Sequence, residues 1–342
     1  MDFHLALQVK PFSQKISIRD KILLAGSCFT EHIGQELRNY KFSVLENPNG
    51  ILFNPVSISK SVTSYIENRQ YKEDDLFYYN ELWTSWQHHS RFSHPVKEEA
   101  LRGINDSQQK AHAFLKKADW LMLTLGSAFV YELGNATPPS SYSGYLQAGE
   151  IVANCHKIPA DKFNKRLPGP EEVISVLDNL MHRLFLFNPG LKIIFTISPV
   201  RHLRDGFVEN NRSKAVLIQA VHQLVDKFEK LFYFPAYELV IDDLRDYRFY
   251  AEDMVHPNYA ATGYVWDKFT EACIDDESKE MMKEIQKISM AAKHKAFHPS
   301  SAQHKQFLAA HLAKAEALQS KHPFLDLSEE ISYFSALLSV KP

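Results

Sequence analysis

Two short motifs hold the residues whose types and spacing best suit covalent chemistry. The first is GSCF at residues 26–29, where Ser27 and Cys28 lie between an apolar run and a helix-permissive stretch. A helix N-terminus exposes unpaired N–H groups and partial positive charge, which lower the pKa of a thiol and can hold an oxyanion. The pattern predicts a nucleophile here. The alternative is that Ser27 only caps the helix and Cys28 is only a small buried residue.

The second motif is AEDMVHPN at residues 251–258, where Asp253 and His256 are three residues apart just before a predicted helix. A carboxylate held beside an imidazole fixes its tautomer and stabilises the imidazolium, which leaves the far ring nitrogen free to accept a proton. The spacing therefore suits a general base and the residue that orients it. The same spacing also occurs by chance in proteins without such a function.

The elements that must position these motifs are predicted by apolar runs. Residues 21–25, 120–125 and 191–197 are continuously apolar, as in strands buried on both faces. An amphipathic helix is expected over residues 211–231, with Ala215, Ile218, Val221, Leu224, Val225 and Phe228 on its apolar stripe. A strand is expected within residues 233–243 and a helix over 257–272. This alternation predicts an α/β protein with a parallel sheet covered by helices on both faces.

The composition shifts from residue 275 onward toward Lys, Glu, Ala, Met and Gln. Only HPSS at His298 and HPF at His322 interrupt this region. We therefore predict one domain over residues 1–275 and a helical C-terminal extension of two or three helices over residues 276–342.

Charge and motif content argue against several classes of function. With 39 basic and 41 acidic residues, the chain has no basic footprint for nucleic acid. No dinucleotide, P-loop or zincin motif occurs, and the three cysteines are too far apart in sequence for a zinc knuckle. The N-terminus does not resemble a signal peptide and no apolar run could cross a bilayer. We expect a cytoplasmic protein with no membrane span, cofactor or metal.

Three histidines, His88, His89 and His94, lie close together in WQHHSRFSHP. Adjacent histidines on a strand point to opposite faces, so they rarely bind one metal ion. We expect one of them, His89, to line the substrate cleft and another to be structural. Arg201, His202 and Arg204 follow the predicted strand at 191–197, where open α/β sheets bind ligands, so Arg201 and His202 are candidate substrate contacts.

The two motifs together resemble the ends of one known pattern. The chain resembles the SGNH, or GDSL-type, hydrolase superfamily, and within it the GSCFA family, whose N-terminal motif reads GSCFT here. The supporting blocks span roughly residues 20 to 270 and are LLAGSCFTEHIG, NPNGILFNP, WQHHSRFS, WLMLTLGSAFVYE, NCHKIP, SPVRHLRDGF with the nearby NNRSKA, and YFPAYELVIDDLRDYRFYAEDMVHPN. The resemblance implies a three-layer α/β/α fold, flavodoxin-like, with a central parallel sheet.

The resemblance also implies roles for single residues. A gap-free match to the superfamily's Gly-Asp-Ser block puts Cys28 in the nucleophile position, whereas a shift of one residue would put Ser27 there. Gly50 and Gly126 match the second and third oxyanion blocks. The third block normally carries an Asn that donates to the oxyanion, but here it reads Gly-Ser-Ala. The candidates to replace that Asn are Asn49, Asn54 and Ser127.

The expected function is acyl transfer by a Cys/Ser-His-Asp mechanism. The enzyme would be an esterase, acyl hydrolase or acyltransferase acting on a small acylated substrate such as a sugar or lipid precursor. Cys28 or Ser27 would attack, His256 would carry the proton, and Asp253 would orient His256. The alternative is a binding or assembly protein that keeps the fold but has lost turnover. The missing Asn and the unusual Ser-Cys pair favour this alternative.

Overall fold

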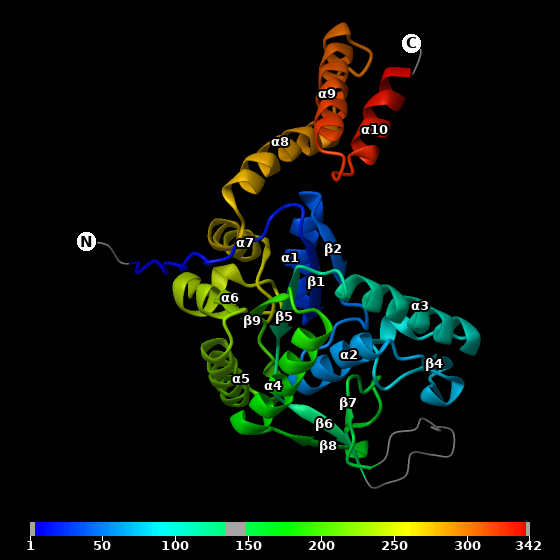
Figure 1. Ribbon diagram of the computed structural model, residues 1–342, viewed down its shortest axis with the longest axis vertical. Helices are drawn as coiled ribbons and strands as arrows, with labels where there is room; N and C mark the ends of the chain where they lie inside the picture. The colour runs from blue at the N-terminus through cyan, green and yellow to red at the C-terminus, as the bar shows by residue number, and fades with distance from the viewer. Residues whose placement is uncertain (1–3, 135–147, 340–342) are drawn as a thin grey trace. The chain divides into compact units, whose positions relative to one another are not determined.

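The computed structural model of the protein describes residues 4–134 and 148–339 (Figure 1). The chain divides into two compact units. The first comprises Met1–Lys10, Lys21–Gly34 and Val44–Phe269, and the second comprises Pro11–Asp20, Gln35–Ser43 and Thr270–Pro342. The predicted domain boundary after residue 275 lies close to the last of these divisions and stays a prediction.

The described residues form the following strands and helices. The strands are β1 (Lys21–Gly26), β2 (Ser43–Glu46), β3 (Phe77–Tyr79), β4 (Leu82–Thr84), β5 (Trp120–Leu125), β6 (Val130–Leu133), β7 (Ile151–Val152), β8 (Phe163–Arg166), β9 (Lys192–Ile197) and β10 (Leu231–Phe234). The helices are α1 (Cys28–Asn39), α2 (Pro55–Glu67), α3 (Lys97–Leu115), α4 (Pro170–Phe187), α5 (Phe207–Lys227), α6 (Ala236–Glu238), α7 (Tyr259–Cys273), α8 (Asp276–Lys293), α9 (Ala302–Lys321) and α10 (Ser328–Ser339).

A five-stranded parallel sheet in the order β10-β9-β5-β1-β2 forms the centre of the first unit. In chain order its strands run 2-1-3-4-5, which is the flavodoxin-like arrangement. The predicted fold class is therefore confirmed. In such a sheet the strand order reverses between the first and third strands, β1 and β5, and a crevice opens there beyond their carboxyl ends. The topology places the candidate site at the carboxyl ends of β1 and β5.

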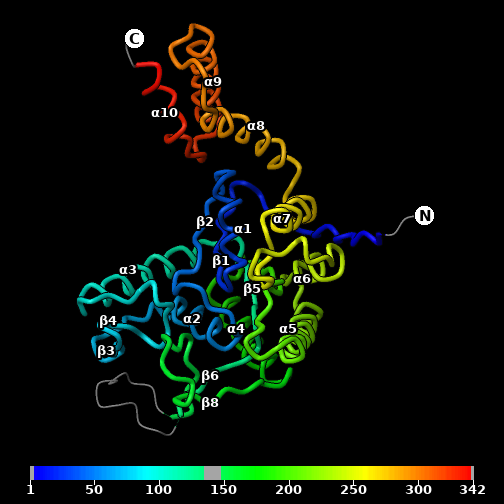
Figure 2. The backbone as a smooth tube through the Cα atoms, turned by 180° about the vertical axis from the view of Figure 1, so that it is seen from behind, coloured from blue at the N-terminus to red at the C-terminus, as the bar shows by residue number. Residues whose placement is uncertain are grey.

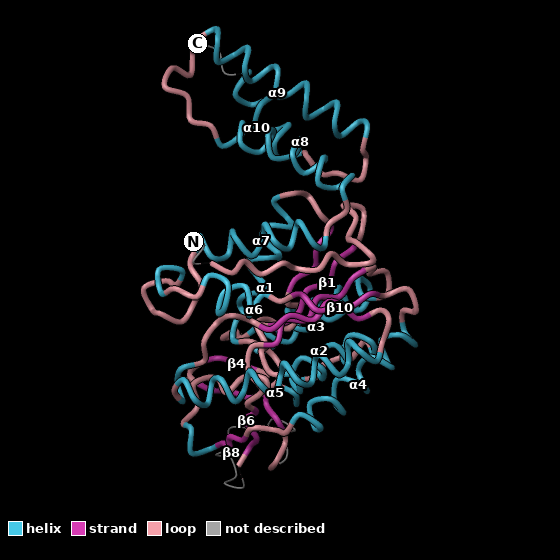
Figure 3. The backbone as a smooth tube through the Cα atoms, turned by 90° about the vertical axis from the view of Figure 1, so that its left-hand side faces the viewer, coloured by secondary structure: helices cyan, strands magenta, loops and turns pink. Residues whose placement is uncertain are grey.

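The central strands are apolar throughout because helices cover both faces of the sheet. Alternate residues of β1, β5 and β9 pack with α2, α3, α4 and α5 in one continuous core. On the other face, Leu24 lies under α1, and Phe234 packs its ring 5.1 Å from that of Phe269 on α7. Figure 3 shows the strands between these two helical layers. The predicted strands at 21–25, 120–125 and 191–197 are thus confirmed.

Two local predictions need correction. The helix expected over residues 211–231 is α5, and five of the six residues predicted on its apolar stripe are buried or pack against the core. The buried face of α5 follows Asn210, Ser213, Lys214, Leu217, Ala220, Val221 and Leu224, whereas Ala215 is exposed. A lysine therefore occupies a position that the apolar pattern excluded. The strand expected within residues 233–243 ends at Phe234, and Ala236 to Leu244 form helical turns instead. Pro235 precedes these turns and cannot donate to the sheet.

Two small antiparallel sheets lie outside the central one. They are the β3-β4 hairpin and the three-stranded sheet β7-β6-β8, and the hairpin contacts α3 (Figures 1 and 2). The two sheets share an aromatic cluster in which Phe77 stacks on Trp86 and Trp86 meets the edge of Phe163. This cluster secures the loop that carries His88 and His89.

The second unit contains the predicted helical extension, with α8, α9 and α10 separated at the two expected interruptions. These helices share a core that includes Leu308, Leu327 and Phe334. Lys41, in the turn after α1, pairs with Glu330 of α10 at 2.8 Å, and both side chains are largely buried. Among the helices that the structure describes, each is too short or too polar to cross a membrane.

Gly26 should be irreplaceable because its φ is +153° and a Cβ there would lie 2.3 Å from the Thr124 carbonyl oxygen. We expect Gly26→Ala to lower the free energy of unfolding by about 3 kcal/mol. Gly103→Ala is the matched control, because no atom lies within 4 Å of the added methyl group and the site is helical. The control should raise stability by about 0.5–1 kcal/mol. Urea unfolding followed by circular dichroism measures both, and equal stability of Gly26→Ala and wild type would contradict the close packing.

Candidate active site

The candidate nucleophile lies at the turn from β1 into α1. The Ser27 N–H donates to the Thr124 carbonyl oxygen (3.1 Å), so the turn is held against the end of β5. Ser27 is only 2% exposed, and its Oγ has no hydrogen-bond partner among the described residues. The interpretation that Ser27 caps α1 through its side chain is therefore wrong. Cys28 is half-buried and is the first residue of α1.

The prediction that Cys28 has a depressed pKa was wrong. Burial raises the pKa of the Cys28 thiol, and the carboxylate of Glu31 raises it further. Hydrogen bonds from the backbone N–H groups of Cys28 and Phe29, and the positive charge of Lys214, act in the opposite direction but are smaller. At neutral pH the group is therefore mainly a thiol and needs a base to activate it.

The Asp253–His256 pair lies in a tight loop that is closed on itself. Tyr250 and Pro257 form an antiparallel bridge, and the Ala251 N–H donates to the His256 carbonyl oxygen at 2.8 Å. Met254 between them adopts a left-handed conformation, with φ of 56°. Immediately afterward the Asn258 side chain accepts the N–H groups of Ala260 and Ala261 and so starts α7.

Within this loop the carboxylate and the imidazole are in direct contact. Asp253 Oδ2 lies 2.6 Å from His256 Nδ1, while Oδ1 accepts the backbone N–H groups of Val255 and His256. These hydrogen bonds lower the pKa of Asp253 to about 2, the backbone bond from His256 contributing most. The carboxylate is thus charged at neutral pH. It holds Nδ1 of the ring, which leaves Nε2 on the far side for proton transfer.

A second segment links this loop to the end of β9. The Arg201 N–H donates to the Val255 carbonyl oxygen (3.1 Å), and the Arg201 guanidinium lies 3.9 Å from the centre of the Tyr250 ring. The neighbouring His202 is close enough to His256 for the imidazolium charge to lower its pKa. Arg201 and His202, which follow β9, therefore lie beside the loop that carries Asp253 and His256.

Gly126 brings this segment beside the nucleophile turn. A Cβ on Gly126 would lie 2.8 Å from Phe53 Cβ, 3.1 Å from His202 Nε2 and 3.3 Å from Ser27 Cβ. His202 Nε2 is buried without a hydrogen-bond partner in the described chain. Burial, followed by the positive charges of Lys214 and His256, lowers the pKa of His202 to about 4. A neutral imidazole therefore faces the space that Gly126 leaves open.

Asn49, one of the predicted oxyanion groups, is 2% exposed, whereas Gly50, Asn54 and Ser127 are engaged elsewhere. The Gly50 N–H donates to the Asn47 carbonyl oxygen (2.7 Å) within a turn, so it could serve an oxyanion only by leaving or sharing that bond. Asn54 caps α2 by accepting the Ser57 N–H at 2.8 Å. The Ser127 hydroxyl contacts the Ser213 hydroxyl at 3.1 Å. The role of each of these residues stays a prediction.

The histidine cluster differs from the expectation because its residues do not lie on a strand. His88 and His89 belong to a turn that leads into a short 3-10 helix, Ser90–Phe92, and His94 follows that helix and forms an isolated antiparallel bridge with Trp83. His88 is 1% exposed, its Nδ1 contacts the Ser85 hydroxyl, and its ring lies 4.7 Å from Tyr71. His89 is half-buried and packs against Gly50. A Cβ added to Gly50 would lie 2.2 Å from the Cβ of His89. Its predicted place in the substrate cleft stays a prediction.

Lys214 was not among the residues predicted for the site. This residue lies on the buried face of α5, and Nζ donates to the carbonyl oxygens of Gly126 and Ser198, each at 2.6 Å. Those carbonyl groups directly follow β5 and β9. The available signal was a lysine placed three residues before Leu217 and seven before Val221, on the stripe that these apolar residues define.

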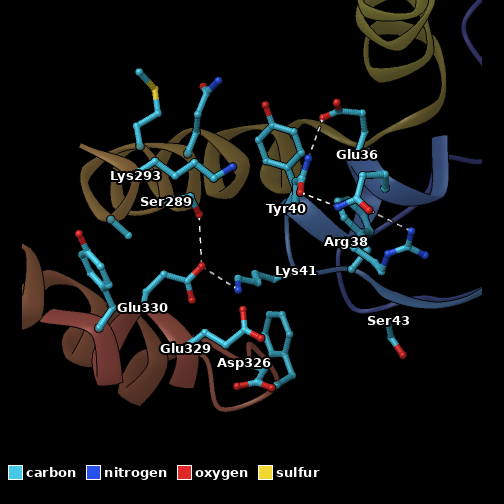
Figure 4. Close-up of a pocket in the computed structure, with 18 residues that line it drawn as sticks. Glu36, Arg38, Tyr40, Lys41, Ser43, Ser289, Lys293, Asp326, Glu329 and Glu330 are labelled. Atoms are coloured by element: carbon cyan, nitrogen blue, oxygen red, sulfur yellow. Dashed lines mark hydrogen bonds and ion pairs between the residues drawn. The ribbon is translucent and has the colours of Figure 1, made fainter. Parts of the chain in front are cut away.

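A pocket of about 900 Å³ lies within the second unit and contains none of the predicted site residues (Figure 4). It is formed by the end of α1, the following turn, α8 and α10. Figure 4 shows Ser289 and Lys41 both directed at Glu330. The acidic and basic side chains around it are mixed, so its lining favours no single class of ligand.

Comparisons with known proteins agree with the motifs. A model of the GSCFA family matches residues 21–269, and a model described as GSCFA domain protein, C-terminal domain, matches residues 285–340. No curated protein matches the chain.

Two solved structures show distant similarity. One is assigned as a platelet activating factor from Streptococcus pneumonia, with 14% identity, a TM-score of 0.37, and coverage of 74% of this chain and 83% of that one. The other is a carbohydrate esterase family 3 protein from Talaromyces cellulolyticus, with 9% identity, a TM-score of 0.35, and coverage of 78% and 99%. Both likenesses are too distant to indicate an activity.

Two buried histidines, His88 and His156, and the half-buried His202 should make the protein sensitive to mild acid. Burial lowers the pKa of His88 to about 3 and those of His156 and His202 to about 4, against about 6.5 in an unfolded chain. As the pH falls from about 6.5 to 5, only the unfolded chain binds these protons, so the folded state loses stability. Each histidine should contribute up to about 1.4 kcal/mol per pH unit.

Urea unfolding at a series of pH values measures this loss. Replacing His156 with Gln should reduce the slope, whereas His294→Gln, at an exposed position, should leave it unchanged. A free energy of unfolding that stays constant between pH 6.5 and 5 would contradict the neutral state of these rings.

Proposed function

The chain belongs to the GSCFA family, and we propose that it is an acyl-ester hydrolase or acyltransferase with Cys28 as nucleophile and His256 as general base. The observation that carries the proposal is the 2.6 Å contact between Asp253 Oδ2 and His256 Nδ1. That contact orients an imidazole in a loop that Arg201 and His202 connect to the turn before Cys28. An aligned base of this kind is what a raised-pKa thiol requires before it can attack a carbonyl carbon.

Accessibility supports Cys28 over Ser27. The Ser27 hydroxyl is shielded from solvent and its residue is 2% exposed, whereas Cys28 is half-buried. A nucleophile must reach a carbonyl carbon that arrives from solvent. Ser27 remains the alternative nucleophile, and it would need the turn to open before a substrate could reach its Oγ.

The reaction has two steps in this proposal. Cys28 Sγ forms a bond to the substrate carbonyl carbon while its proton passes to His256 Nε2, and the carbonyl oxygen becomes an oxyanion. When the oxyanion collapses, the bond to the leaving oxygen breaks and that oxygen takes the proton from His256. Water or an acceptor alcohol then attacks the thioester and gives its proton to His256. The second collapse restores the Cys28 thiol and releases the acid or the new ester.

His202 is our candidate for the donor that replaces the missing Asn. Its Nε2 is buried without a partner in the described chain and borders the same small space as Ser27. Because its pKa is lowered to about 4, the ring is neutral at pH 7 and can donate one N–H without carrying charge. The N–H of Cys28, at the start of α1, would be the second donor.

The substrate in this proposal is a small acylated molecule, such as a sugar or lipid precursor. Arg201 provides a positive charge beside His202, and its guanidinium lies within 6 Å of the ring centres of Phe207, Tyr247 and Tyr250. Aromatic rings beside a cation suit a substrate that has both apolar and polar parts. A cytoplasmic location is part of the proposal and is tested by fractionation of the source cells.

The second candidate is a binding or assembly protein that uses the same cleft without turnover. Two observations favour it: the Gly50 N–H is engaged in a turn, and the pKa of Cys28 is raised. Both would weaken acyl transfer. This candidate predicts that an acylated ligand binds while its ester bond stays intact.

The proposed function predicts that His256→Ala lowers acyl-ester turnover by about 10³- to 10⁴-fold, because the members of a triad act as a unit. Asp253→Asn should cost nearly as much, because an amide favours the wrong tautomer of His256. A panel of acetyl and short-chain acyl esters, with circular dichroism as the folding control, measures both.

The matched control is His182→Ala. His182 also faces an aspartate, Asp178, at 3.6 Å, but on the exposed surface of α4. This variant should keep wild-type turnover. Equal activity of all three variants and wild type would contradict a catalytic role for Asp253 and His256. A wild type that binds esters without cleaving them would favour the binding protein.

A further inference from the structure

Lys214 is a buried charged group that the proposed reaction does not use. It is 1% exposed, and lysines are almost never fully buried without a partner. Its two hydrogen-bond acceptors are both neutral carbonyl oxygens, of Gly126 and Ser198. Within residues 4–134 and 148–339, no carboxylate lies within ion-pair distance of Nζ. The ammonium is therefore held in place by carbonyl dipoles but is not neutralised.

The position of Lys214 makes Cys28 its electrostatic neighbour. Strands β9, β5 and β1 lie side by side, and Nζ bridges the residues that follow the first two. Cys28 follows β1. The adjacent Ser27 lies beside Gly126, since a Cβ added to Gly126 would be 3.3 Å from the Ser27 Cβ. The interaction is reciprocal, since the Lys214 charge lowers the pKa of Cys28 and a Cys28 thiolate raises that of Lys214.

Lys214 can lose its proton in the neutral range. Burial outweighs the attraction to Cys28 and lowers the pKa of Lys214 to about 7. Small changes of pH near neutrality therefore change the charge beside Cys28. Because Lys214 is buried and Cys28 is half-buried, solvent screens the interaction between them less than it screens two surface charges.

We propose that Lys214 is a proton switch for the nucleophile: its ammonium form favours the Cys28 thiolate, and its neutral amine form leaves Cys28 as the thiol. This proposal rests on the proposed function in one respect, which is that Cys28 is the reacting group. Lys214 acts through its charge and is a positioning residue for the thiolate, whereas His256 remains the group that accepts the proton.

The groups that surround this pair come from several elements. Glu31 on α1 raises the pKa of Cys28, and the Tyr237 ring on α6 lies 5.7 Å from Lys214 Nζ. His202 responds to the Lys214 charge and also to the nearby charged groups His256, Lys165 and Asp205. Because His202 is neutral above about pH 4, it contributes no change of charge in the range where Lys214 titrates.

The coupling predicts an unusual pH profile for alkylation of Cys28. A lone thiol below its pKa gains about tenfold in thiolate for each pH unit. In a coupled pair, the state with ammonium and thiolate has the same number of protons as the state with amine and thiol. Their ratio does not change with pH, so the alkylation rate should flatten where Lys214 loses its proton, near pH 7.

The experiment measures alkylation of Cys28 by iodoacetamide from pH 6 to 9, with mass spectrometry of the Cys28 peptide. Wild type should show the flattened region. The alkylation rate of Lys214→Met should be about tenfold lower than that of wild type at pH 6. It should rise about tenfold per pH unit and equal the wild-type rate by about pH 9. Lys214→Arg keeps the charge at every pH, so it should match wild type at pH 6 and rise without flattening.

Lys227→Met is the matched control, because Lys227 lies on the same helix, half-exposed and paired with Asp178. It should reproduce the wild-type profile. A wild-type rate that rises tenfold per unit from pH 6 to 8, or superimposable profiles of wild type and folded Lys214→Met, would overturn the switch. The wild-type profile decides even where Lys214→Met does not fold. Alkylation needs no ester, so absence of ester turnover would contradict the proposed function and leave this result intact.

Discussion

Strands β1 and β5 end so close together that the Thr124 carbonyl oxygen lies 2.3 Å from where a Cβ of Gly26 would be. Only glycine satisfies this approach, and the chain can then turn at once into α1. The turn is held because the Ser27 N–H donates to that same Thr124 oxygen. Everything proposed for Cys28 depends on this contact. It starts α1 at Cys28 and places the thiol at the switch point of the sheet.

The carboxyl edge of the sheet is unusually polar for a region so well buried. Thr124 and Thr196, paired neighbours in β5 and β9, are fully buried, and Lys214 lies on the two carbonyl groups that follow these strands. Such groups are costly to bury unless they have a role or a partner. Of these groups, Lys214 acts on Cys28, whose pKa is set by a balance. Burial and Glu31 oppose the thiolate, while the backbone N–H groups and Lys214 favour it.

The sequence was a reliable guide where a pattern is local and a poor one where partners come from distant segments. Continuous apolar runs predicted β1, β5 and β9, because burial on both faces leaves no polar positions. The Asp253–His256 contact also followed from spacing alone. The pKa of Cys28 did not, since it depends on Glu31 and Lys214 as well as on the helix N-terminus. Lys214 was missed because the buried face of a helix is predicted from its apolar residues. A lysine among them is normally assigned to the exposed face.

The central claim is that an acyl group is carried by Cys28. Mass spectrometry of the protein, quenched in acid during turnover of an activated acetyl ester and then digested, tests it most directly. We predict one acetyl group on the peptide that contains residues 27 and 28. Neutral hydroxylamine should remove it, as it removes a thioester, and it should be absent from Cys28→Ala. An acetyl group that resists hydroxylamine and persists in Cys28→Ala, or ester turnover in Cys28→Ala at the wild-type rate, would contradict it.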